Sequence, residues 1–194
     1  MIEQLQLMEV IEKYRGDAVV IPIFQSNRRW VEVTKHPNRD ISIAPMGKGS
    51  SFALGIALAR PDTKVILLDG DGSLEMNLGS LITVAGQRPK NFYHFVIQNG
   101  VYATTGGQPI PGPNDLSFSD MAKAAGYEQS YYFEDLEEFS SNAERILNQV
   151  GPVMICVRTV AEIRTSKERA VQRAIPGRKP PSETFRNLRS ELDS

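Results

Sequence analysis

The sequence has little of three features that would each indicate a specialised class of protein. Cys156 is the single cysteine among 194 residues, so neither an intrachain disulfide nor a cluster of thiolate metal ligands can form. No apolar run approaches the roughly 20 residues that a membrane-spanning helix needs. The N-terminal segment carries Glu3, Glu9 and Glu12 among its apolar residues, which is unlike a signal peptide. We therefore expect a cytoplasmic protein.

The chain also lacks a strong excess of charge. Its formal net charge is −1, which gives no reason to expect nucleic acid or an anionic membrane as a partner. Residues 158–194 nevertheless carry nine Lys or Arg against five Asp or Glu, a local net charge of +4. We predict one well-cored domain over residues 1–157 and a basic tail over residues 158–194, which is either solvated or clasps an acidic neighbour.

Apolar strand patterns alternate with helical patterns along the chain. Short apolar runs predict strands at residues 18–24, 41–44, 65–68, 92–97, 130–133 and 153–157. Helical spacing predicts helices at residues 2–15, 49–59, 116–125 and 136–150. We expect the polar residues 25–29 to form a loop, followed by a short element over residues 30–33. The alternation predicts an α/β fold of three layers, α/β/α, with a mainly parallel sheet.

An Asp-Gly-Asp-Gly motif, residues 69–72, separates a predicted strand from a predicted helix. Gly70 and Gly72 are expected to take dihedrals that a side chain would forbid and to let a ligand approach the backbone. The first N–H groups of the helix would then face an anion such as phosphate, and Ser73 could cap the helix or bind the same anion. On this motif alone, a purely structural Asp-Gly turn remains an equal alternative.

Asp71 lies between the two glycines, where a carboxylate is poorly placed to contact phosphate directly. It suits a hard cation that lies between the carboxylate and the phosphate, since Mg²⁺ prefers oxygen ligands. The next predicted strand ends at residues 98–100, Gln-Asn-Gly, which expose an amide oxygen and loop carbonyl oxygens. Because parallel strands end at one edge of a sheet, we predict a Mg²⁺ site formed by Asp71, Asn99 and Val101.

The spacing of these motifs resembles a known signature. Gly70-Asp71-Gly72, followed after 25 residues by Gln98-Asn99, is similar to the diphosphate and metal signature of thiamine diphosphate enzymes. Within them, MGKGSS at 46–51, DGDGSLEMNLGSL at 69–81 and NGVYATTGGQ at 99–108 look most like the sulfopyruvate decarboxylase small subunit and the matching domain of phosphonopyruvate decarboxylase. The chain departs from the family pattern at Gln98, at Glu75, where an apolar residue is common, and along its tail.

The resemblance implies thiamine diphosphate and Mg²⁺ as cofactors and decarboxylation of a 2-oxo acid as the reaction. It implies that Met46 supports the cofactor in a bent form and that the Ala44 carbonyl accepts from its 4′-amino group. An ordinary core role remains the alternative for Met46. A stretch that lines the reaction chamber in the family matches Tyr102, Thr104, Thr105 and Gln108. For the threonines of that stretch, a loop-folding role is about equally well supported.

The resemblance also implies that part of the active site is missing. In the family, a Glu from a separate pyrimidine-binding domain activates the cofactor, and the diphosphate-binding pattern fully occupies this one domain. We expect a subunit of a hetero-oligomer whose partner carries that Glu. The alternatives are an aldehyde-transferring subunit and a non-catalytic, cofactor-binding regulatory subunit. A dinucleotide-binding domain is disfavoured because no GxGxxG follows the first strand. Neither His36 nor His94 is assigned to catalysis.

Overall fold

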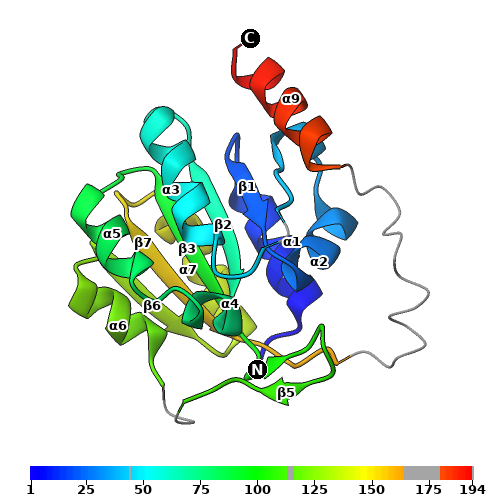
Figure 1. Cartoon of the computed structure of the whole chain (residues 1–194), viewed down its shortest axis with the longest axis vertical. Helices are drawn as coiled ribbons and strands as arrows, with labels where there is room; N and C mark the ends of the chain where they lie inside the picture. The colour runs from blue at the N-terminus through cyan, green and yellow to red at the C-terminus, as the bar shows by residue number, and fades with distance from the viewer. Residues whose placement is uncertain (44, 113–115, 164–179, 194) are drawn as a thin grey trace.

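A five-stranded parallel sheet forms the centre of the molecule (Figure 1). The structure is a computed structural model of the whole chain and describes residues 1–43, 45–112, 116–163 and 180–193. The strands, in their order across the sheet, are β1 (Val19–Pro22), β2 (Val65–Gly70), β3 (Phe92–Gln98), β7 (Val153–Arg158) and β6 (Gln129–Phe133). All four pairings in this sheet are parallel, so the carboxyl ends of the strands lie at one edge.

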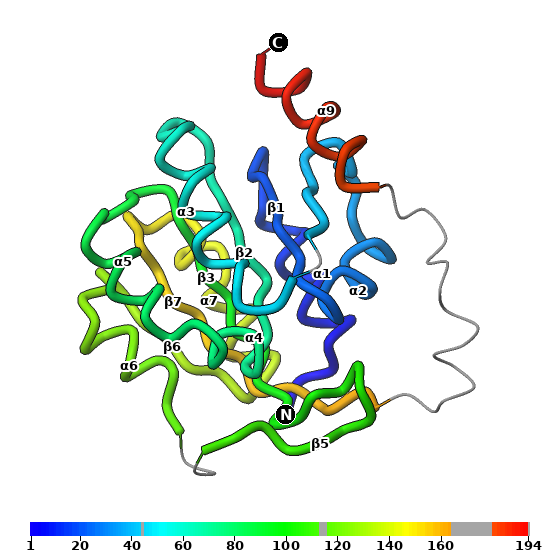
Figure 2. The backbone as a smooth tube through the Cα atoms, viewed as in Figure 1, coloured from blue at the N-terminus to red at the C-terminus, as the bar shows by residue number. Residues whose placement is uncertain are grey.

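Helices cover both faces of the sheet, which confirms the predicted three-layer α/β/α fold (Figures 1 and 2). One hydrophobic core lies under α3 (Gly49–Ala59), α5 (Ser80–Gln87) and α6 (Phe118–Ala125). The second lies under α1 (Gln4–Tyr14), α2 (Gln25–Val33) and α7 (Leu136–Ile146). Successive strand side chains alternate between the two cores, as Leu67 and Leu68 of β2 do.

Three small elements lie at the carboxyl edge: α4 (Asp71–Glu75), β4 (Val101–Tyr102) and β5 (Gln108–Pro109). The 3-10 helix η1 (Pro37–Arg39) lies near the start of β1, where Arg39 donates to the Asp17 carbonyl, and α9 (Pro181–Leu192) packs against η1. β4 and β5 form an antiparallel pair that the sequence pattern did not predict. Among the described residues, no helix is both long and apolar enough to cross a membrane.

Two predicted elements near the N-terminus are wrong. Residues 25–33 form one helix, α2, and not a loop followed by a short element. Its buried residues Ser26, Asn27 and Trp30 follow helical spacing, but two of the three are polar, so an apolar pattern could not reveal the buried face. The predicted strand at 41–44 is also absent from the described residues 41–43. Ile43 makes only an isolated bridge to Ile23, beside the edge strand β1.

The described end of the predicted basic tail is a helix that packs on the domain. Leu188 of α9 is buried in the core under α3, and the ring of Phe185 meets that of Phe52 edge-on at 5.6 Å between centroids. Arg60 at the end of α3 donates a hydrogen bond to the Leu192 carbonyl. Residues 164–179 of the predicted tail lie outside the described residues.

A buried arginine joins the N-terminal elements. The guanidinium of Arg15, only 1% exposed, forms ion pairs with Asp40 at 2.8 Å and with Glu12 at 3.4 Å. It also donates to the Ala18 carbonyl at 2.6 Å and lies over the ring of Trp30. The guanidinium thereby places a cation between two buried carboxylates and holds α1, β1 and α2 together.

Replacing this arginine should destabilise the fold strongly. We expect Arg15→Met to lower the free energy of unfolding by about 3–5 kcal/mol, because it leaves two buried carboxylates without their cation. The matched control, Arg28→Met, removes a half-exposed arginine whose ion pair with Glu32 spans 4.0 Å, and should cost less than about 1 kcal/mol. Urea unfolding of both variants measures the difference, and equal losses would contradict this account.

Candidate functional site

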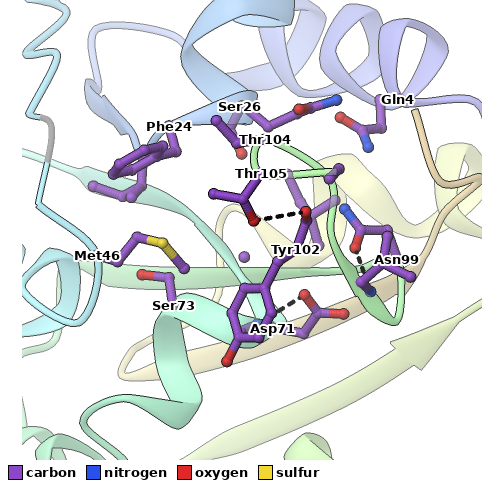
Figure 3. A pocket seen from close by; sticks show the side chains of 17 residues that line it. Gln4, Phe24, Ser26, Met46, Asp71, Ser73, Asn99, Tyr102, Thr104 and Thr105 are labelled. Carbon is purple, nitrogen blue, oxygen red and sulfur yellow. Dashed lines mark hydrogen bonds between the residues drawn. The ribbon is translucent and has the colours of Figure 1, made fainter. Parts of the chain in front are cut away.

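The carboxyl ends of β1, β2 and β3 surround a cavity of about 180 Å³ (Figure 3). Met46 and Ser73 lie on one side of it in this view, Asn99 lies on the other, and Tyr102 lies between them. Of the predicted site residues, those that line the cavity are Met46, Gly70, Asp71, Gly72, Ser73, Asn99, Val101, Tyr102, Thr104 and Thr105. The structure thus brings together residues that are far apart in the sequence. Ala44 lies outside the described residues.

Asp71 is the first residue of α4, directly after β2, and is only 3% exposed. Its two carboxylate oxygens accept from backbone amides, one from Gly72 at 2.8 Å and the other from Gly100 at 2.7 Å. Burial raises the pKa of this carboxyl above its usual value, although the amide hydrogen bonds, that of Gly100 first, act in the opposite direction. The negative charge is therefore held in place but is not neutralised.

Asn99 and Val101 follow β3 and bring oxygen atoms to the same edge of the sheet. The side-chain oxygen of Asn99 accepts from the Val101 amide at 3.0 Å, which fixes the direction of the side chain. The Val101 carbonyl accepts from the Ala103 amide at 3.0 Å. Each of these oxygens has a second lone pair that could face a cation. The Gly100 amide links this loop to Asp71, so the two strand ends form one unit.

The two glycines of the motif act differently from the sequence prediction. Neither Gly70 nor Gly72 is among the glycines with positive φ, so the predicted forbidden dihedrals are wrong. Gly72 is needed because a Cβ there would lie 2.5 Å from Cε1 of Tyr102, whose ring packs on it. At Gly70, with φ of −103°, an added Cβ would have no described atom within 4 Å beyond its chain neighbours. Gly70 therefore leaves open space at the cavity.

Met46 and Ser73 belong to a hydrogen-bonded junction between the loop before α3 and α4. Ser73 is buried, and its hydroxyl accepts from the Gly47 amide at 3.1 Å, whereas the N-terminus of α4 has no side-chain cap. The Gly47 carbonyl accepts from the side-chain amide of Asn77 at 3.0 Å. The predicted capping role of Ser73 is therefore wrong, because its oxygen fixes the turn that directs Met46.

The residues predicted to line the reaction chamber form a compact loop between β4 and β5. The Thr105 hydroxyl lies 2.9 Å from the side-chain oxygen of Gln108 and 3.3 Å from the Tyr102 carbonyl oxygen, and its single proton is donated to one of these two acceptors at a time. Tyr102, Thr104 and Thr105 reach the cavity, while Gln108 is exposed and does not line it. The Thr105–Gln108 pair therefore has at least a loop-folding role.

Glu75 adds a second carboxylate beside the site. One of its oxygens is buried without a hydrogen-bond partner among the described residues. Burial first, and then the charge of Asp71, raise its pKa. Burial also raises the pKa of Tyr102, and the charges of Glu75 and Asp71 add to that effect. This part of the molecule is therefore acidic.

Several lining residues at the end of β1 were missed by the sequence prediction. Phe24, Gln25 and Ser26 line the cavity, as does the buried Gln4 of α1. Phe24 takes a positive φ of 47°, which is uncommon for a bulky residue. The position of the segment directly after a parallel strand could have indicated its place at the site.

The oxygen atoms of Asp71, Asn99 and Val101 suit a cation that contacts both the protein and a bound anion. Asp71 is the one charged side chain among the described residues that line the cavity. Within the described part of the chain, no group of three or more His, Cys, Asp or Glu could hold a metal ion by itself. One carboxylate, one amide oxygen and a backbone carbonyl leave further positions for water or phosphate oxygens, as Mg²⁺ sites commonly do.

Comparison with known proteins adds independent information. Residues 22–157 match the family model "Thiamine pyrophosphate enzyme, C-terminal TPP binding domain". The sulfopyruvate decarboxylase subunit beta of Methanocaldococcus jannaschii is 38% identical over 118 residues, 61% of this chain and 62% of that protein. The subunit beta of Methanothermobacter thermautotrophicus is 33% identical over 77% of this chain and 79% of that protein.

Longer proteins match over a smaller part of their length. The phosphonopyruvate decarboxylase of Streptomyces viridochromogenes is 33% identical over 73% of this chain but only 35% of its own. A similar fold occurs in the benzoylformate decarboxylase of Polynucleobacter necessarius, with a TM-score of 0.69, 21% identity, and coverage of 81% of this chain and 33% of that one. This chain belongs to the family of thiamine pyrophosphate enzymes and carries their C-terminal TPP binding domain.

Proposed function

We propose that this chain is the diphosphate- and Mg²⁺-binding subunit of a heteromeric, thiamine diphosphate-dependent 2-oxo acid decarboxylase. The observation that carries the proposal is the joining of two strand ends, in which the buried carboxylate of Asp71 accepts from the amide that follows Asn99. The family match supports the cofactor. The names of the relatives support a 2-oxo acid such as sulfopyruvate or phosphonopyruvate as substrate.

In this proposal each part of the cavity has one task. Asp71, Asn99 and the Val101 carbonyl hold Mg²⁺, and the open space at Gly70 admits the diphosphate close to the backbone. Met46, directed by the Ser73–Gly47 hydrogen bond, supports the middle of the cofactor. The chemistry that thiamine diphosphate supplies when bound is an electron sink for the loss of carboxylate from a 2-oxo acid. Thr104 and Thr105 form part of the substrate wall.

The partner in this proposal is a pyrimidine-binding subunit that contributes the activating Glu. Two observations support it. The relatives that match over most of their length are named subunits, and the longer decarboxylase matches over only about a third of its chain. The remaining two thirds of such a chain offer room for the missing half of the site.

Replacing Asp71, the proposed metal ligand, should weaken cofactor binding while the chain still folds. We expect Asp71→Asn to weaken Mg²⁺-dependent thiamine diphosphate binding by at least about tenfold. Without Mg²⁺, its free energy of unfolding should change by less than about 2 kcal/mol, because loss of the buried charge offsets the one backbone amide hydrogen bond that the NH2 group of Asn cannot accept. Calorimetry and urea unfolding test both statements. The control, Asp62→Asn in an exposed turn, should change neither, and unaltered cofactor binding by the Asp71 variant would refute the assignment.

A methyl group at Gly70 should block the cofactor without disturbing the free chain. The φ of Gly70 allows Ala, and an added Cβ meets no described atom beyond its neighbours, so the unfolding midpoint should not change. Affinity for thiamine diphosphate with Mg²⁺ should fall at least about tenfold by steric exclusion. Gly86→Ala in α5, also in open space, is the control and should stabilise the chain by about 1 kcal/mol. Wild-type affinity in Gly70→Ala would place the diphosphate elsewhere.

The isolated chain should bind the cofactor much more weakly than the complex with the partner subunit does. A ligand at a hundredfold excess over its dissociation constant stabilises a protein by on the order of 2.7 kcal/mol. We therefore expect thiamine diphosphate with Mg²⁺ to raise the melting temperature of the co-purified complex clearly and that of the isolated chain only slightly. The complex is then assayed on a panel of 2-oxo acids that includes sulfopyruvate and phosphonopyruvate. Decarboxylation by the isolated chain would show that the half-site proposal is wrong.

A further inference from the structure

Three polar side chains form a row inside the apolar core under α3, α5 and α6. Asp69 of β2, His94 of β3 and Tyr127 before β6 are 1%, 0% and 5% exposed. We call these three residues the buried polar row. They come from three separate parts of the chain, and none of them lines the cavity described above.

The contacts of the buried polar row run from the core to the carboxyl end of β2. Tyr127 places its hydroxyl at hydrogen-bond distance, 3.2 Å, from Nδ1 of His94. Nε2 of His94 lies 3.6 Å from a carboxylate oxygen of Asp69, which is too long for a hydrogen bond but close enough for electrostatic attraction. The other carboxylate oxygen of Asp69 accepts from the Gly70 amide at 2.9 Å. The row therefore ends on the Gly70 amide, one residue before Asp71.

Stability alone does not account for such a row. Buried polar or ionic groups can often be replaced together by apolar residues of similar shape at little cost or with a gain in stability. Most of the neighbours are apolar, among them Leu67, Val96 and Met154, so an apolar row would fit this core. What distinguishes this row from the rest of the core is its place in the sequence, because Asp69 lies two residues before Asp71.

We propose that Asp69 and His94 are positioning residues that fix the end of β2, so that Asp71 faces the cation. This inference rests on the proposed function, because it assumes that Asp71 is a ligand of Mg²⁺. His94 keeps the Asp69 carboxylate on the core side of the sheet, where that carboxylate holds the Gly70 amide. Without His94, a lone carboxylate in this core is unfavourable. It would turn toward water at the strand end and pull the peptide between residues 69 and 70 with it.

The test uses the full chain, isotope-labelled and in complex with its unlabelled partner subunit, and follows Mg²⁺ binding in the presence of thiamine diphosphate. The probes are the amide chemical shifts of Gly72 and Gly100, which donate to Asp71. We expect His94→Phe to lower Mg²⁺ affinity about tenfold, as changes behind a metal ligand commonly do. Asp69→Asn keeps an acceptor for the Gly70 amide and has no charge to compensate. Adding Asp69→Asn to His94→Phe should therefore restore the affinity to within about threefold of wild type, which a double-mutant cycle measures.

Tyr127→Phe is the matched control, because it removes only the hydroxyl at the far end of the row. It should lower the urea midpoint and leave Mg²⁺ affinity within about twofold of wild type. If His94→Phe fails to fold, His94→Gln, which keeps an N–H group for the side of Asp69, should keep wild-type affinity, and a tenfold loss there would overturn the inference.

The two proposals fail in different ways. If the wild-type chain in complex with its partner subunit shows no Mg²⁺-dependent shifts with thiamine diphosphate, the proposed function is overturned. If the wild-type chain binds and His94→Phe binds equally well while it unfolds at lower urea, only the positioning role is overturned, and His94 merely packs.

Discussion

A carboxylate buried at the end of a strand is unfavourable unless a compensating group reaches it, and Asp71 is such a carboxylate. Its backbone partners come from both sides of the site, Gly72 in α4 and Gly100 after β3. These amides orient the charge, yet burial still raises the pKa of the carboxyl. The rest of the site is arranged around this incomplete compensation, which a divalent cation would complete.

The neighbouring segments are held in place relative to Asp71. The ring of Tyr102 packs on Gly72, and the Ser73 hydroxyl ties the Gly47 turn to α4. On the core side, Asp69 holds the Gly70 amide with His94 behind it. These contacts thus connect a short helix, two strand ends and one loop along one edge of the sheet.

The parts of this structure that follow a simple period could be predicted from the sequence. The predicted helix at 49–59 has the same bounds as α3. The predicted strand at 65–68 agrees with β2, because burial on both faces gives that strand a continuous apolar pattern. The prediction that Asp71 and Asn99 lie near each other, at the carboxyl ends of neighbouring strands, also agrees with the structure. Cofactor roles for these residues, and the division at residue 157, stay predictions.

The remaining features depend on contacts that no local pattern contains. The buried face of α2 includes Ser26 and Asn27, which an apolar periodicity cannot detect. Gly72 is required by a ring that lies 30 residues further along the chain, and not by its own dihedrals. Residues 41–43 are buried as a strand would be, but the only bridges at this segment are isolated ones, from Asp40 to Val20 of β1 and from Ile43 to Ile23. In each case the tertiary partner decides the role of the residue.

The most direct test of the central claim is the position of the metal. A crystal of the chain with thiamine diphosphate and Mn²⁺, measured at the manganese absorption edge, locates the ion by its anomalous signal. The account predicts one peak about 2.0–2.3 Å from a carboxylate oxygen of Asp71 and from the side-chain oxygen of Asn99, with diphosphate oxygens completing the shell. A cofactor bound with its metal at another part of the chain, or with no metal at Asp71, would contradict it.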